Sequence, residues 1–160
     1  VVPVALVAPG PLATEAARGV LPESVPHADA AANAGRSALL VAALTSDTAG
    51  DSAALLDATQ DRLHQPYRAG VMPATAALVR RLREAGIPAV VSGAGPSVLA
   101  FLQRTLSPGG TSAPAGLDVV DSTVREMGSG WSISVLDVDR HGASIQSVTP
   151  DVSPAGGTPQ

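Results

Sequence analysis

A glycine-rich segment between two apolar stretches is the first candidate for chemistry. It comprises Ser92, Gly93, Ala94, Gly95, Pro96 and Ser97. Glycines and a proline allow a sharp turn, and such a turn can aim N–H groups at an anion or at another loop. The pattern is not a Walker loop, which needs Gly-Lys-Ser/Thr, nor a Rossmann fingerprint, which a helix should follow. A plain hairpin connection would use the same residues, so both interpretations stand at this point.

Thr14 and Arg18 form a second candidate. They are four residues apart, which places both side chains on one face of the short helix expected there. A guanidinium can hold a carboxylate through two hydrogen bonds, and a neighbouring hydroxyl can add another. The alternative is a solvated helix face on which the threonine only opens or caps the helix.

Arg68 ends the segment DRLHQPYR and is the third candidate. Pro66 forces a helix break there, and His64 and Tyr67 crowd the same place, a geometry that can direct polar side chains into a cleft. The alternative is an arginine at a helix end, paired with Asp61 or with the last helical carbonyls.

The composition argues against several other kinds of site. The 160 residues include 10 Arg, no Lys, no Cys and 14 acidic residues, for a formal charge of −4. A negative chain is a poor partner for nucleic-acid backbones, and without lysine it has no lysine phosphate clamp. His27, His64 and His141 are far apart in the sequence, so no zinc site is expected. SGAGPS does not place a serine at the centre of GxSxG, so a serine hydrolase is not indicated.

The elements that must hold these residues follow from apolar spacing. Strands are expected at residues 1–8, 87–91, 98–102, 131–138 and 143–148, and helices at 14–21, 26–45, 52–65, 73–85 and 117–127. Two of these strands flank the glycine-rich segment as a hairpin, without a helix between them. That order favours an antiparallel sheet layered against helices, an α+β sandwich, over a doubly wound parallel sheet.

Two stretches lack a packing pattern. Residues 105–116 are low in complexity and are expected to form a flexible insertion in a loop. Residues 150–160 are expected to be a disordered tail. No apolar stretch approaches the length of about 20 residues that spans a bilayer, and the lack of cysteines and of a charged leader favours a cytoplasmic location.

Four segments, in order, resemble the C-terminal half of a homoserine kinase from high-GC actinobacteria, a member of the GHMP kinases. They are ATEAARGVLP, PHADAAANAGRSALLVAAL, DRLHQPYRAGVMP and VVSGAGPSVLAF, the last containing what looks like the third GHMP signature motif. The resemblance implies a ferredoxin-like C-terminal domain at residues 26–149, preceded at residues 1–25 by the last strand and helix of a ribosomal S5-like N-terminal domain.

The resemblance also implies a reaction, the transfer of the γ-phosphoryl group of ATP to the hydroxyl of L-homoserine. Thr14, Arg18 and Arg68 match positions that hold the amino acid in the family, and the loop from Ser92 to Ser97 matches one near the phosphate site. A zwitterionic substrate with a carboxylate suits guanidinium partners. No catalytic residue and no metal ligand is expected among these 160 residues.

The family's phosphate loop and its Mg²⁺ ligand do not match any segment of this sequence. The chain is therefore expected to be a C-terminal part that is inactive alone, with ATP and Mg²⁺ bound largely by upstream residues. A homodimer is a further expectation from the family. Two alternatives stand beside this hypothesis, another GHMP small-molecule kinase of the mevalonate type and a non-catalytic amino-acid-binding domain of the ACT-like kind.

Overall fold

A computed structural model describes residues 1–45, 52–104, 106–107, 110–111, 113–139, 141–143 and 145. The helices are α1 (Thr14–Gly19), α2 (His27–Thr45), α3 (Ser52–Ala58), α4 (Gln65–Arg68), α5 (Pro73–Glu84) and α6 (Leu117–Glu126). The strands are β1 (Val2–Val7), β2 (Ala89–Val91), β3 (Val98–Leu102), β4 (Leu106–Ser107), β5 (Gly110–Thr111) and β6 (Ser132–Val135).

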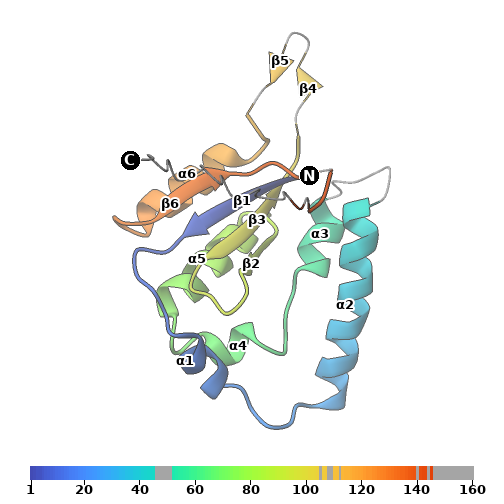
Figure 1. Ribbon diagram of the computed structural model, residues 1–160, viewed down its shortest axis with the longest axis vertical. Coiled ribbons are helices and arrows are strands. Elements are labelled where there is room, and N and C mark those ends of the chain that lie inside the picture. The colour runs from blue at the N-terminus through green and yellow to red at the C-terminus, as the bar shows by residue number, and fades with distance from the viewer. Residues whose placement is uncertain are drawn as a thin grey trace, which may run out of the picture.

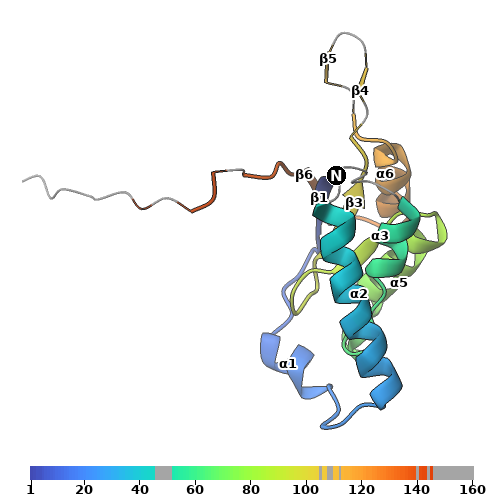
Figure 2. The same cartoon turned by 90° about the vertical axis from the view of Figure 1, so that its right-hand side faces the viewer.

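Four of the strands form one antiparallel sheet in the order β2-β3-β1-β6. Helices α5 and α6 cover the same face of that sheet (Figures 1 and 2). The chain order β1, α5, β2, β3, α6, β6 is the βαββαβ arrangement of a ferredoxin-like fold. The expected α+β sandwich of antiparallel sheet and helices is confirmed.

Buried and partly exposed side chains alternate along the strands, and the buried ones form the core between the sheet and its two helices. In β3, Val98, Ala100 and Leu102 are buried, and the residues between them are only partly so. Helix α5 places Leu78 and Leu82 against that face, four residues apart and with no exposed area. Because burial of a leucine contributes about 1.5–3 kcal/mol, this layer fixes where the chain enters and leaves the glycine-rich segment.

Strand β1 belongs to the same sheet as three strands from residues 26–149. Strand β1 is an inner strand, with Val4 opposite both Ala100 of β3 and Val135 of β6. Val2, Val4 and Leu6 are buried on one face of the strand, and Val4 and Leu6 belong to the core cluster that includes residues of α5 and α6. The strand therefore forms part of the ferredoxin-like sheet.

Helices α1 to α4 form an insertion between β1 and α5. The long helix α2 packs alongside α3 at one side of the sheet (Figure 1). Helices α1 and α4 lie together at the other end of this insertion, where a hydrogen bond from Arg68 to the Ala17 carbonyl joins them. This insertion carries Thr14, Arg18 and Arg68.

The stretch at residues 105–116 contains structure that its composition did not suggest. Strands β4 and β5 pair as a short antiparallel hairpin, Leu106 with Thr111 and Ser107 with Gly110, which projects from the body of the molecule (Figure 1). The expected last strand at 143–148 lies largely outside the described residues, and the expected tail at 150–160 lies wholly outside them. Within the described ranges, no helix has the length and apolarity needed to cross a membrane.

Candidate functional site

The glycine-rich segment is a tight connection between β2 and β3. The Ser92 N–H donates to the Ser97 carbonyl at 2.8 Å, and the Gly95 N–H donates to the Ser92 carbonyl at 3.0 Å. Gly95 has a φ of +87°, and a Cβ there would lie 2.8 Å from Met72 Sδ. Both facts require glycine at this position, since L side chains rarely adopt this conformation and the space is filled. The peptide bond between Gly95 and Pro96 is cis.

Helix α5 fixes the far side of this loop. Thr75, with 2% of its surface exposed, donates its hydroxyl hydrogen to the Pro96 carbonyl at 2.8 Å. The residue lies in the first turn of α5, so the loop is attached to the helix that packs under the sheet. Thr75 was not singled out from the sequence, because a threonine near a helix start has no distinctive spacing.

Arg68 lies in the interior of this region. Its side chain is on the one-turn helix α4, and only 8% of the residue is exposed. The Nε group donates to the Ala17 carbonyl at 3.0 Å, and Nη1 donates to the Gly93 carbonyl at 3.1 Å. One guanidinium therefore links α1 to the glycine-rich loop, two elements that the sequence selected independently.

The surroundings of Arg68 exclude the helix-end interpretation. Its two acceptors belong to distant segments, neither Asp61 nor the last carbonyls of its own helix. These bonds use two of the five N–H donors of a guanidinium. Among the described residues, no carboxylate lies within 4.0 Å of the Arg68 guanidinium, whose two hydrogen-bond acceptors are neutral carbonyls.

Thr14 and Arg18 are both exposed on α1. Thr14 is the first residue of the helix and makes no capping hydrogen bond, the cap position being Ala13. Arg18 follows Ala17, whose carbonyl accepts from Arg68. The two arginine-bearing elements are thus in contact, while a shared ligand for both guanidinium groups stays a prediction.

Asp61 is the residue whose importance the sequence did not show. Its carboxylate accepts hydrogen bonds from the backbone N–H groups of Leu63, His64 and Gln65 and from the amide of Asn33. Burial would by itself raise the pKa of Asp61. The hydrogen bonds from Gln65, Asn33, Leu63 and His64 together outweigh burial and lower the pKa to about 2.

A cavity of about 270 Å³ lies beside Arg68. It is lined by Asp61, His64, Gln65, Arg68, Val90, Val91 and Gly93. This volume suits a small polar molecule better than a large apolar one. The cavity therefore brings Arg68 and the glycine-rich loop to one space that a ligand could enter.

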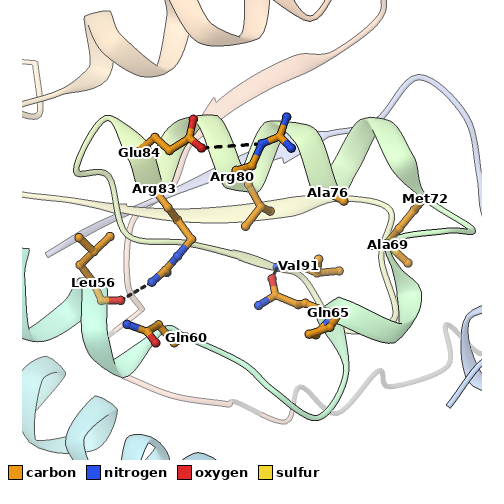
Figure 3. A pocket seen from close by; sticks show the side chains of 12 residues that line it. Leu56, Gln60, Gln65, Ala69, Met72, Ala76, Arg80, Arg83, Glu84 and Val91 are labelled. Carbon is orange, nitrogen blue, oxygen red and sulfur yellow. Dashed lines mark hydrogen bonds and ion pairs between the residues drawn. The ribbon is translucent and has the colours of Figure 1, made fainter. Parts of the chain in front are cut away.

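A second cavity, of about 540 Å³, lies between α5 and the segment from α3 to α4 (Figure 3). Its walls are largely apolar, and its polar groups are already bonded: Gln65 accepts from the Val91 N–H, and Arg83 donates to the Leu56 carbonyl. Arg83 also donates to the Ala89 carbonyl. Gln65 and Arg83 thereby cover the free edge of β2, which protects it from pairing with another strand.

The described residues contain no group of three or more His, Cys, Asp or Glu side chains that could hold a metal ion. The Arg68 guanidinium in the wall of the smaller cavity is a group that can bind and orient a small anion or carboxylate.

Comparisons with known proteins agree with this architecture. Residues 40–108 match the model of the family described as GHMP kinases C terminal. The chain is 50% identical to a homoserine kinase of Streptomyces avermitilis over 91% of this chain and 42% of that protein. It is 43% identical to a homoserine kinase of Clavibacter michiganensis over 96% of this chain and 45% of that protein.

A solved structure supports the fold. The crystal structure of homoserine kinase from Cytophaga hutchinsonii aligns with a TM-score of 0.66 and 21% identity, covering 86% of this chain and 41% of that one. The chain spans less than half the length of the curated relatives described above. The chain is thus similar to the C-terminal domain of GHMP kinases at residues 40–108 and, over most of its length, to part of proteins named homoserine kinase.

Proposed function

We propose that this chain is the C-terminal part of an ATP-dependent homoserine kinase. The reaction would transfer the γ-phosphoryl group of ATP to the side-chain hydroxyl of L-homoserine, giving O-phospho-L-homoserine for threonine biosynthesis. Relatives at 43–50% identity are named homoserine kinase, which supports homoserine as the substrate. The match to a kinase family supports the use of ATP.

The observation that carries the proposal is the Arg68 guanidinium, which is buried and has no ion-pair partner among the described residues. A buried charge without a counter-charge is unfavourable, and a ligand carboxylate would supply one. Arg68 lines a cavity of about 270 Å³ next to the glycine-rich loop. A homoserine carboxylate held there would fix the far hydroxyl, and phosphoryl transfer depends mainly on such positioning.

Thr14 and Arg18 are proposed to complete the substrate site. Their helix contacts Arg68 through Ala17, so a second guanidinium is available from the same side. Both residues are exposed in this chain, and exposed side chains can turn toward a ligand without breaking a buried contact.

The loop from Ser92 to Ser97 is proposed to shape the phosphate end of the site. ATP and Mg²⁺ would be bound mainly by the part of the relatives' length that this chain does not span, because the described residues offer no cluster of metal-binding side chains. When bound, Mg²⁺ would neutralise phosphate charge. A cytoplasmic homodimer belongs to the same proposal.

The direct test is formation of phosphohomoserine by the complete enzyme with ATP, Mg²⁺ and L-homoserine. Turnover by the complete enzyme and none by these 160 residues alone is the expected result. Equal turnover by the isolated chain would show that the proposed phosphate-binding residues are wrongly placed. A preference for mevalonate in a substrate panel, or amino-acid binding without phosphorylation, would favour one of the two alternatives, which the relatives do not support.

A further inference from the structure

We propose that Asp61, held by Asn33, is a positioning residue that fixes Arg68 for the substrate carboxylate. This inference rests on the proposed function. It comes from the hydrogen bonds that join α2, the start of α4 and Arg68.

Asp61 determines where α4 begins. One carboxylate oxygen, Oδ2, accepts from the His64 N–H at 2.9 Å and from the Gln65 N–H, while Oδ1 accepts from the Leu63 N–H at 3.1 Å. The N–H groups of His64, the cap residue, and of Gln65, the first helical residue, are ones that a helix start otherwise leaves without partners. The carboxylate thus occupies the role of a helix cap, although it stands four residues before the first helical residue.

The path from Asp61 to Arg68 is short. The His64 N–H donates to Asp61, and the carbonyl of the same residue accepts from the Arg68 N–H at 3.1 Å. Helix α4 has only four residues, far fewer than a helix needs to be stable by itself in water. The backbone position of Arg68 therefore depends on contacts outside its own turn, and Asp61 provides those at its start.

Asn33 attaches this unit to the long helix α2. Its Nδ2 group donates to Asp61 Oδ1 at 2.7 Å, and its Oδ1 accepts from the Arg62 N–H at 2.9 Å. The two bonds join Asn33 to residues 28 and 29 positions further along the sequence. Helix α2 thereby fixes the position of the segment that begins α4. Helix α4 in turn positions Arg68 so that its Nη1 group donates to the Gly93 carbonyl.

A direct role of Asp61 in binding the substrate ammonium group is less consistent with the contacts. Asp61 and Arg68 line the same cavity, so a zwitterion could in principle lie between them. Oδ1, however, already faces Asn33, Leu63 and His64 Nδ1, and Oδ2 accepts two backbone N–H groups. These five contacts use the lone-pair capacity of the carboxylate, so its action is on the protein rather than on the ligand.

The test uses steady-state kinetics of the complete enzyme with Asp61→Ala, Asp61→Asn and Asn33→Ala. We expect Asp61→Ala to raise the KM for homoserine roughly tenfold, the effect of losing about one strong hydrogen bond, with the KM for ATP unchanged. Asp61→Asn should have a smaller effect, because asparagine is also a good helix cap. Asp57→Asn, on the neighbouring helix, is the matched control and should change neither constant.

A double-mutant cycle with Arg68→Ala separates positioning from general damage to the fold. If Asp61 acts through Arg68, Asp61→Ala should add little to the homoserine KM once Arg68 is gone. An equal, additive increase in both backgrounds would overturn the inference, as would an unchanged KM in Asp61→Ala beside a raised KM in Arg68→Ala.

Two further results have distinct meanings. Should Asp61→Ala fail to fold, Asp61→Asn and Asn33→Ala carry the test, and normal homoserine KM values in both would overturn the inference. If the wild-type enzyme forms no phosphohomoserine, the proposed function itself fails. That outcome differs from one in which Arg68→Ala raises the homoserine KM and Asp61→Ala does not, which would overturn only the role of Asp61.

Discussion

Among the described residues, Arg68 and Arg83 donate to backbone carbonyls, and the difference between their surroundings supports the proposal that Arg68 binds the substrate while Arg83 is structural. Arg83 donates through Nη1 and Nη2 to the carbonyls of Leu56, Thr59 and Ala89 and to the Thr59 hydroxyl, so four protein acceptors surround it. Arg68 donates to two carbonyls only and lines an open cavity. Arg83 therefore has four protein acceptors and Arg68 has two, which leaves Arg68 more donors for a ligand.

The cavities beside these arginines show the same contrast. The larger one, of about 540 Å³, is lined mainly by apolar side chains and by polar groups that already have partners. The smaller one, of about 270 Å³, adjoins the glycine-rich loop and the unpaired charge. The proposed substrate site is therefore the smaller of the two cavities.

The largest expected effect comes from Arg68→Ala in the complete enzyme. Loss of a buried partner for the substrate carboxylate should raise the homoserine KM by an amount equivalent to roughly 2–4 kcal/mol, because a buried charge would lose its counter-charge. Steady-state kinetics with varied homoserine would measure it. Unchanged kinetics would place Arg68 with Arg83 as a purely structural residue.

Arg83→Ala should lower the stability of the protein and leave the homoserine KM unchanged. We expect the free energy of unfolding to fall by about 1–3 kcal/mol, since several buried carbonyls lose their donor. The homoserine KM of the folded fraction should stay the same. Denaturant unfolding and steady-state kinetics on one preparation would measure both quantities. A raised homoserine KM without loss of stability would contradict a purely structural role for Arg83.

Acid titration tests the network behind Arg68. The pKa of Asp61 is lowered to about 2 from an ordinary value of 3.8, so its contribution is fully present above pH 4 and is lost as the pH falls toward 2. The shift corresponds to roughly 2 kcal/mol. Unfolding midpoints of the wild type and of Asp61→Asn should converge across this range, and a constant gap would contradict the pKa of Asp61.

Gly95→Ala tests the loop beside Arg68. The positive φ and the contact with Met72 should together lower the free energy of unfolding by roughly 1–3 kcal/mol. Gly86→Ala is the matched control, since Gly86 also has a positive φ but open space around it. Thermal unfolding of both variants would show whether the close approach matters, and equal losses would mean that it does not.

The smallest effect is expected for Arg80→Ala at the mouth of the larger cavity. Its ion pair with Glu84, at 3.8 Å, is largely exposed and should contribute no more than about 0.5 kcal/mol. Neither stability nor the homoserine KM should change measurably. A clear kinetic effect would mean that the larger cavity has a role in the reaction.

The sequence predicted the elements with strong periodicity. The strand at 98–102 and the helix from Pro73 were recognised because one face of each is apolar and packs into the core. The glycine-rich turn was recognised because positive φ values demand glycine.

The parts that were missed depend on contacts between distant segments. The place of β1 between β3 and β6 could not be read from its composition, because any buried strand shows the same apolar pattern. Asp61 looked like a surface partner for Arg68, since a carboxylate near an arginine suggests an ion pair. Its true partners are backbone groups and Asn33, which local spacing does not reveal.

The most direct test of the central claim compares L-homoserine with 3-aminopropan-1-ol, which keeps the amine and hydroxyl but lacks the carboxylate. The wild-type enzyme should discriminate strongly against the analogue in kcat/KM. Arg68→Ala should lose most of that discrimination, because the group that recognises the carboxylate is gone. Equal discrimination by both enzymes would contradict the assignment of Arg68 to the substrate carboxylate.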